Sequence, residues 1–408
     1  MDTFQGLYHG VPLVQHAIMV ITPALLLQLP PSYWRKYVAV PVLTAVFYYV
    51  STIAVHSSLI LAYFHGLSVT VNYIVCLDLF LVNEYPENTD YQPKKETLES
   101  VRSARSFSLK KLNWALRRSF YVIRGVGWVT SSRTKRNQPA PPVSRTSFIL
   151  RQLKLFVWQF AAVVVGKIYL RQFKYYKFEG RDLDYPNILS ESPSLVDFVG
   201  NYVALSYNIF FGLDSTYRVA VLFAVATGLS TPEECPPFFN FSRFGESPPL
   251  KVFWGDVWHQ WLFRNYSLCR GLTDKLFGNS SFGKIAAIYL TFVLGGLLHW
   301  YANLSFPWFA QNGRQPYHVV LVFVYWCLTL RLEDRCGQLL GPQLAKLPKL
   351  VRKVAAIGWL LVVHFPAVFV FFGELLQGGI DEPPTPEEEQ QLAQLATSVT
   401  NTIFGWMT

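Results

Sequence analysis

The chain has 408 residues, 51% of them hydrophobic and 15% charged, with a formal net charge of +10. Soluble domains usually carry about 25% charged residues, so the composition excludes an ordinary soluble protein. Nucleic-acid binding is not expected either, because the positive charge is concentrated beside apolar runs, where the positive-inside rule accounts for it.

Apolar runs of roughly membrane-spanning length recur along the chain. A single run can be a buried core helix of a soluble protein, but this interpretation does not extend to all of them. The runs predict an all-α, polytopic integral membrane protein with roughly nine transmembrane helices. They cover residues 11–29, 37–55, 59–82, 153–170, 194–212, 217–229, 285–301, 317–330 and 354–376.

A polar, basic segment separates the first three runs from the rest. It covers residues 84–150 and holds thirteen Lys or Arg residues against five acidic ones. We expect it in the cytosol, against anionic lipid head groups. Within it, a helix over 109–124 is predicted to lie in the interface through its aromatic side chains, Trp114, Phe120 and Tyr121. The chain is thus divided into N-terminal membrane helices (1–83), this loop, a membrane core (151–380) and a polar tail (381–408).

The polar segment between the sixth and seventh runs carries most of the unusual residues. Prolines forbid a regular helix in its first half, and the Ser-Pro-Pro sequence at 247–249 is typical of a helix start. On the helix that follows, Trp254, Trp258 and Trp261 are predicted to share one face. An aromatic belt at the membrane surface is the alternative role for these tryptophans.

Polar side chains lie off that tryptophan face. Asp256 and His259 are predicted i, i+3 neighbours on the helix, a spacing at which a carboxylate can fix the tautomer of an imidazole. Gln260 is adjacent, and Arg264 lies one turn further on. The alternative role for His259 is that of a polar residue satisfied at the membrane surface.

A second histidine, His299, lies deep in the run 285–301. Ionisable residues inside a membrane are costly and usually face a cavity or the bundle interior. Gly295, one turn earlier, lets a helix or a ligand approach the imidazole, although helix packing also explains this glycine. A neutral imidazole can act as a general base on a hydroxyl. The other histidines, among them His364 ahead of Pro366, are predicted to serve packing or backbone capping.

Together these residues resemble the membrane-bound O-acyltransferases. The resemblance rests on Phe253-Trp254-Gly255-x-x-Trp258-His259-Gln260, on the Pro-Pro-Phe-Phe sequence at 236–239, and on Gly295-Gly296-Leu-Leu-His299. It is strongest with the wax synthase-like branch, which includes fungal enzymes that acetylate hydroxyls of terpenoid and meroterpenoid products. The first 150 residues resemble the family only in hydropathy.

The resemblance implies that His299 is the catalytic base and that His259 is the second polar residue of the site. It also implies that acyl-CoA, as co-substrate, enters from the cytosolic face and meets an alcohol in an internal chamber, without a bound cofactor or metal. The predicted supporting residues are Asp256, Gln260, Trp258 and Gly295. The residues predicted to contact substrate or CoA are Phe253, Trp254, Arg264, Lys251 and Arg243, although each basic residue can equally serve the surface.

The leading prediction is an endoplasmic reticulum O-acyltransferase that moves an acyl group, acetyl by preference, to a lipophilic alcohol. A terpenoid or meroterpenoid of secondary metabolism is the expected acceptor. One alternative is a long-chain wax ester or sterol ester synthase. Another is a proton-coupled transporter with histidine relays, but a transporter favours repeated halves, and the sequence has no evident repeat.

Overall fold

The computed structural model of the chain describes residues 11–30, 32–53, 59–82, 92–93, 104–116, 118–119, 128–129, 143–170, 194–228, 230–240, 249–258, 263–304 and 315–377. These residues are helical apart from turns, short irregular stretches and one ladder of two short antiparallel strands, β1 (Gln92–Pro93) and β2 (Trp128–Val129). The predicted all-α membrane fold is confirmed in this coarse form.

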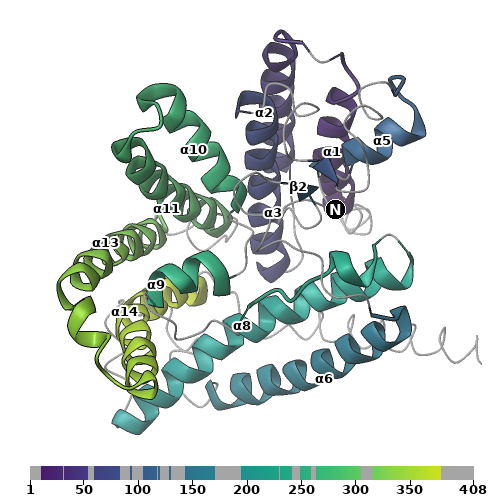
Figure 1. Cartoon of the computed structure of the whole chain (residues 1–408). Coiled ribbons are helices and arrows are strands. Elements are labelled where there is room, and N and C mark those ends of the chain that lie inside the picture. Colours follow the sequence, from purple (N-terminus) through teal and green to yellow (C-terminus); the bar gives the residue numbers. More distant parts are fainter. Residues whose placement is uncertain are drawn as a thin grey trace, which may run out of the picture.

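The N-terminal helices are α1 (Val11–Leu26), α2 (Arg35–Ile53), α3 (Leu59–Leu77) with its π-helical extension η2 (Asp78–Val82), and α5 (Leu109–Leu116). The later helices are α6 (Arg145–Leu170), α8 (Leu195–Ala226), η6 (Pro232–Glu234), α9 (Pro249–Val252), η8 (Phe253–Val257), α10 (Phe263–Phe277), α11 (Ser281–Asn303), α13 (His318–Leu344) and α14 (Lys349–Gln377). Figure 1 shows α1, α2, α3 and α5 gathered on one side, with α6 and α8 running side by side across the base.

Within the described residues, five helices are long and apolar enough to cross a membrane. They cover Tyr63–Val82, Arg145–Leu170, Val196–Ala226, Ser281–Asn303 and Lys349–Leu375. Of the nine predicted spans, those at 11–29, 37–55 and 317–330 form helices that are not among these five. The count of nine is therefore not confirmed, whereas the integral membrane character is.

The two predicted spans at 194–212 and 217–229 are wrong, because this stretch is the single 32-residue helix α8. Its polar middle does not end the helix, because a neighbouring helix satisfies it. The Asp214 carboxylate accepts hydrogen bonds from the Gln159 amide of α6 (2.6 Å) and from Nη2 of Arg218 (2.6 Å). Because the carboxylate is paired in this way, an apolar helix can accommodate Asp214 and Arg218 without a break.

Helix α6 packs antiparallel to α8. Gln159 meets Asp214, whereas further along α6 the Ala162 carbonyl accepts from the hydroxyl of Tyr207, 3.0 Å away. Residues later in α6 therefore contact residues earlier in α8, as expected for antiparallel helices. The Ser194 side chain caps α8 by accepting from the backbone N–H of Asp197.

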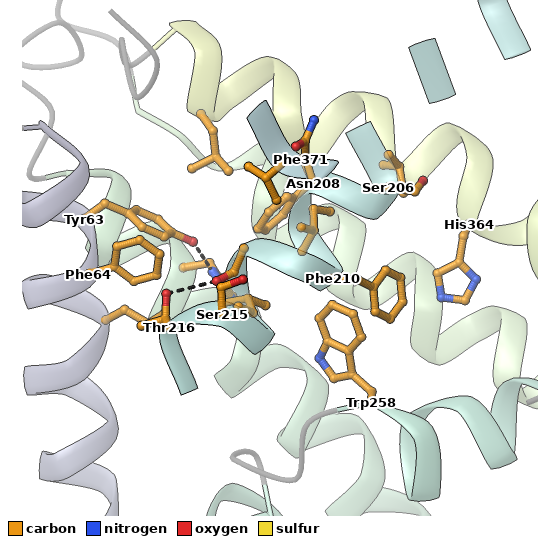
Figure 2. Close-up of a pocket in the computed structure, with 18 of the residues that line it drawn as sticks. Tyr63, Phe64, Ser206, Asn208, Phe210, Ser215, Thr216, Trp258, His364 and Phe371 are labelled. Atoms are coloured by element: carbon orange, nitrogen blue, oxygen red, sulfur yellow. Dashed lines mark hydrogen bonds between the residues drawn. The ribbon is translucent and has the colours of Figure 1, made fainter. Parts of the chain in front are cut away.

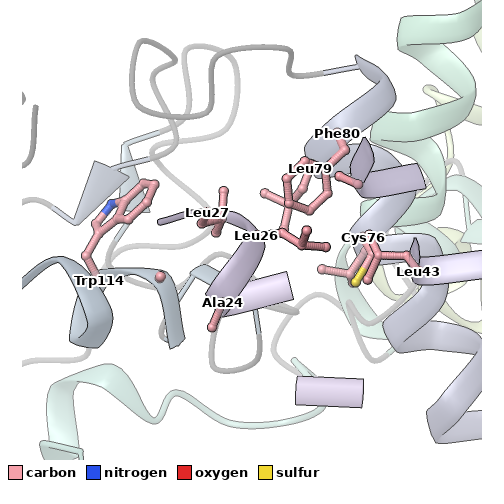
Figure 3. Packing of buried hydrophobic residues seen from close by; sticks show 11 residues of the cluster. Ala24, Leu26, Leu27, Leu43, Cys76, Leu79, Phe80 and Trp114 are labelled. Carbon is pink, nitrogen blue, oxygen red and sulfur yellow. The ribbon is translucent and has the colours of Figure 1, made fainter. Parts of the chain in front are cut away.

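The predicted interfacial helix at 109–124 is partly wrong. Helix α5 ends at Leu116, and Trp114 is fully buried (0% exposed) rather than facing lipid head groups. Figure 3 shows Trp114 in the same core as Leu27, which directly follows α1, and Phe80 of η2. The side chain of Gln28, just after α1, anchors this docking by accepting from the backbone N–H of Phe107 at 3.0 Å. Phe120 and Tyr121 lie outside the described residues.

The hairpin of α10 and α11 leads directly to His299. Gly278 adopts a positive φ of 62° that ends α10, and the Ser280 hydroxyl caps α11 by accepting from the backbone N–H of Gly283. Further along α11, Gly296 lets α13 approach, since a Cβ there would lie 2.9 Å from the Val320 Cα. Helix packing, the alternative considered for this glycine pair, thus accounts for Gly296.

Candidate functional site

An apolar cavity of about 560 Å³ lies among the helices of the core. Its lining comes from α3, α6, α8, η8, α11, α13 and α14, so residues far apart in sequence share one space. Phenylalanine, leucine and valine side chains form much of this lining, and a small number of polar side chains interrupt them. Such a composition is typical of small-molecule sites, which are largely apolar with few well-placed polar groups.

His299 of α11 lines this cavity and has a hydrogen-bond partner on α3. Its Nδ1 lies 2.6 Å from the Tyr63 hydroxyl, a contact drawn as a dashed line in Figure 2. The imidazole also stacks against Phe323, with ring centroids 5.2 Å apart, and meets the edge of Phe371 at 5.2 Å. The ring is therefore held on three sides, with Nδ1 engaged.

The tryptophan motif does not form the predicted regular helix. After the four residues of α9, one π-helical turn follows, closed by the hydrogen bond from the Trp258 N–H to the Phe253 carbonyl (2.7 Å). Trp258 itself is extended, with φ −64° and ψ 147°, so the helical backbone ends at Val257. Trp261 and His259 lie outside the described residues, so the predicted tryptophan face and the predicted pairing of Asp256 with His259 stay predictions. Single π turns of this kind often occur at functional sites.

The π turn brings three aromatic rings of the motif together at the cavity. Phe253, Trp254 and Trp258 all line it, and their ring centroids lie 5.2 to 5.7 Å apart. The Pro-Pro-Phe-Phe sequence packs behind them, since the Phe239 ring lies 5.3 Å from that of Trp258. A hydrogen bond from the Asn240 N–H to the Val257 carbonyl (3.2 Å) ties the two segments together.

A buried carboxylate anchors the start of the motif. The Glu333 side chain of α13 accepts from the backbone N–H groups of Leu250 (3.0 Å) and Lys251 (3.2 Å) and from Nε1 of Trp359 (2.9 Å). It thereby caps α9, the role that the sequence suggested for Ser247, which lies outside the described residues. Glu333 follows the apolar part of α13, and burial raises the pKa of its carboxyl.

His364 of α14 also lines the cavity, a position that the sequence did not suggest. Its Nδ1 lies 2.9 Å from the Leu360 carbonyl, so the predicted backbone capping is present. The ring is surrounded by aromatic side chains, with centroid distances of 4.5 Å to Phe253, 5.9 Å to Trp254 and 5.7 Å to Trp326. Figure 2 shows the free edge of the imidazole turned toward Trp258 and Phe210.

The structure brings together only part of the predicted set. His299, Phe253, Trp254 and Trp258 line the cavity. Asp256 and Gly295 are buried but are not among its lining residues, and Lys251 is exposed. His259, Gln260 and Arg243 lie outside the described residues, as does the side chain of Arg264 on α10. Nothing in these positions tests their predicted roles.

Tyr63 is the main site residue that the sequence analysis missed. It lies in the third apolar run, where a tyrosine has no distinguishing signal, and 236 positions separate it from His299. Among the described residues, no group of three or more His, Cys, Asp or Glu side chains is arranged to hold a metal ion.

Comparison with known proteins identifies the region around this site. Residues 235–325, which include the tryptophan motif and His299, match the membrane bound O-acyl transferase family. No solved structure matches the chain.

Several fungal proteins are similar to this chain. The acetyltransferase atnC of Arthrinium sp is 27% identical over 346 residues, which cover 78% of this chain and 76% of that protein. The acetyltransferase ple2 of Rhodocybe pseudopiperita is 24% identical over 56% of this chain and 60% of its own length. The acetyltransferase spyB of Aspergillus fumigatus is 27% identical over 41% of this chain and 29% of its own length.

Proposed function

We propose that this chain is an acyltransferase of the membrane bound O-acyl transferase family and that it moves an acetyl group from acetyl-CoA to a hydroxyl of a lipophilic small molecule. The observation that carries the proposal is His299, which faces an apolar cavity among membrane helices and has its Nδ1 engaged by Tyr63. The names of the fungal relatives favour acetyl as the group transferred. A terpenoid or meroterpenoid acceptor and the endoplasmic reticulum membrane complete the proposal.

The reaction is a direct transfer with His299 as general base. With Nδ1–H donated to the Tyr63 hydroxyl, Nε2 is left to take the proton of the acceptor alcohol. The alcohol oxygen attacks the thioester carbonyl, and the tetrahedral intermediate collapses by breaking the carbon–sulfur bond. The leaving thiolate receives the proton from His299, so the products are the ester and free CoA.

The cavity supports an apolar acceptor. Its volume of about 560 Å³ falls in the range of small-molecule sites, roughly 300–1,000 Å³. Its apolar walls exclude water, which would otherwise compete with the alcohol for the thioester. In this proposal His259 stabilises the oxyanion of the intermediate, with Asp256 and Gln260 in support.

Acetyl-CoA is proposed to approach from the cytosolic face. Its phosphates require basic side chains, and Lys251, Arg243 and Arg264 are the proposed contacts, because all three flank the motif in sequence. Lys251 is exposed at the start of the motif, which leaves its ammonium group accessible to such a ligand.

The decisive experiment is acyl transfer in microsomes that contain the full-length chain. Labelled acetyl-CoA and palmitoyl-CoA are offered in turn with a panel of lipophilic alcohols. We expect acetyl transfer by the wild type, none by His299→Ala, and a severe loss in His259→Ala. Leu297→Ala is the matched control, because Leu297 lies on the same helix but is exposed on its outer side.

Each outcome of this experiment has a clear meaning. Full activity in His299→Ala would rule out the assigned base. Preferential transfer from palmitoyl-CoA would replace acetyl transfer with wax ester or sterol ester synthesis. Absence of transfer from either donor to every alcohol would contradict the proposal as a whole.

A further inference from the structure

One nitrogen of His364 has no hydrogen-bond partner in the part of the chain that the structure describes, and the proposed mechanism does not use it. Its Nδ1 lies 2.9 Å from the Leu360 carbonyl, and because a carbonyl only accepts, Nδ1 carries a proton. In the neutral ring Nε2 is then a hydrogen-bond acceptor. Nε2 is buried and has no hydrogen-bond partner among the described residues. Buried polar atoms are normally paired in native proteins, so an unpaired acceptor at a cavity wall points to a ligand.

Two unpaired donors lie beside this acceptor. The indole Nε1 atoms of Trp254 and Trp326 are also buried without a partner among the described residues. The Trp254 and Trp326 ring centroids lie 4.7 Å apart, and each ring lies within 6 Å of the imidazole. We call Phe253, Trp254, Trp326 and His364 the His364 box. The box combines one acceptor and two donors in one part of the cavity wall.

The His364 box is separate from the proposed reaction centre. The two imidazoles contact different side chains of α13, since Phe323 lies 5.2 Å from His299 and Trp326 lies 5.7 Å from His364. The Phe323 and Trp326 rings lie 5.1 Å apart. A group bound in the box is therefore not the hydroxyl that His299 deprotonates.

We infer that the His364 box binds a second hydroxyl of the acceptor, so that the enzyme selects diols over mono-alcohols. This inference rests on the proposed function. A hydroxyl can donate to Nε2 of His364 and at the same time accept from an indole N–H. A ketone would leave Nε2 unpaired, and a carboxylate would offer it no proton. Because the two imidazoles contact different side chains of α13, the two hydroxyls belong on different parts of the skeleton.

The test uses a steroid diol with hydroxyls at opposite ends of its ring system and the matching mono-alcohol. His364→Phe keeps an aromatic ring and removes both ring nitrogens, Nε2 and the Nδ1 that contacts the Leu360 carbonyl. In this variant we expect KM for the diol to rise about 10- to 100-fold, the usual result of leaving a buried polar group unpaired. The KM for the mono-alcohol should rise far less than that for the diol, because the mono-alcohol has no hydroxyl for the His364 box, and KM for acetyl-CoA should not rise. His364→Gln should recover part of the loss, because its side-chain oxygen can accept.

Diol binding without turnover separates this inference from the proposed function. Binding is followed by tryptophan fluorescence of the purified chain, with Val362→Ala, exposed on the same helix, as the control. Weaker diol binding in His364→Phe supports the inference even if the wild type transfers no acetyl group. The absence of acetyl transfer would contradict only the proposed function. Equal diol binding by wild type and His364→Phe would overturn the inference. Equal losses for both alcohols, or a raised KM for acetyl-CoA, would also overturn it.

Discussion

The hydroxyl of Tyr63 lies 2.6 Å from Nδ1 of His299, although 236 positions separate the two residues. The contact joins α3 to α11, so the N-terminal helices contribute directly to the imidazole of the core. This contact holds the orientation of the ring, and with the proton on Nδ1, as the proposed function requires, Nε2 is the basic nitrogen. Tyr63 is thus a positioning residue for the proposed base.

Replacing Tyr63 with phenylalanine should slow turnover and leave substrate binding intact. We expect kcat to fall about 10- to 100-fold, because Nδ1 loses its partner and the tautomer is no longer fixed. KM for acetyl-CoA should not change. Tyr73→Phe is the matched control. Tyr73 lies on the same helix as Tyr63, its hydroxyl contacts Thr44 of α2 at 2.8 Å, and it is not among the lining residues. Equal kcat in Tyr63→Phe and wild type would refute the positioning role.

A substitution at Glu333 should loosen the start of the motif. In Glu333→Gln one acceptor oxygen is replaced by an amide that faces the N–H groups of Leu250 and Lys251. We expect a loss of about 1–3 kcal/mol in the free energy of unfolding. Thermal unfolding of the detergent-solubilised protein measures it.

The same residue should give a pH-dependent contribution to stability. Burial raises the pKa of the Glu333 carboxyl, so the folded state binds its proton more tightly than the unfolded state. Its stabilising contribution is therefore full below the unfolded pKa of 4.5 and is lost as pH rises through the folded pKa. The stability difference between wild type and Glu333→Gln should decrease as pH rises from this value. An increase would mean that the three N–H donors dominate over burial.

The two glycines Gly296 and Gly358 should respond oppositely to alanine. In a helix interior, alanine is more stabilising than glycine by about 0.5–1 kcal/mol. A Cβ at Gly358 would meet nothing within 4 Å. At Gly296 the Cβ would lie 2.9 Å from the Val320 Cα, which forces α13 outward. We expect Gly358→Ala to unfold at the wild-type temperature or above. Gly296→Ala should unfold lower and lose activity, because α13 carries Phe323 beside His299.

The charge pair on α8 should contribute far more than a surface pair. Asp214→Ala leaves Arg218 without its carboxylate in a largely buried position, which we expect to cost about 3–5 kcal/mol. Asp274→Ala removes a carboxylate whose side chain is 40% exposed, and Arg270 keeps the Asn279 Oδ1 acceptor at 2.9 Å, so the loss should be at most about 1 kcal/mol. Similar unfolding temperatures for the two variants would contradict this difference. Replacing Asp214 and Arg218 together with leucine should restore much of the stability.

The sequence predicted the membrane helices well where apolar runs were uninterrupted. Helices α6, α11 and α14 lie where such runs predicted them. The prediction failed at Asp214, because hydropathy treats each residue alone and cannot register that Gln159 and Arg218 satisfy its carboxylate. It failed at Trp114 for a similar reason, since burial against α1 is a tertiary contact.

The candidate site was predictable only in part. The motif and His299 were identified from residue type and spacing, and Trp254 and His299 do line one cavity. The π turn was not predictable, because the spacing of tryptophans is compatible with an ordinary helix. Tyr63 was missed because its role depends on a long-range contact. For His364, the capping of the Leu360 carbonyl was foreseen, whereas the unused Nε2 depends on its neighbours in space.

The unbroken course of α8 bears on how the protein sits in a bilayer. Its 32 residues measure about 48 Å at 1.5 Å per residue, whereas a hydrocarbon core is roughly 30 Å thick. The helix must therefore lean steeply, emerge from the lipid, or locally thicken the membrane. Because α6 is paired with it, the antiparallel pair adopts one inclination together. The cavity wall that this pair supplies therefore takes the same inclination as α8.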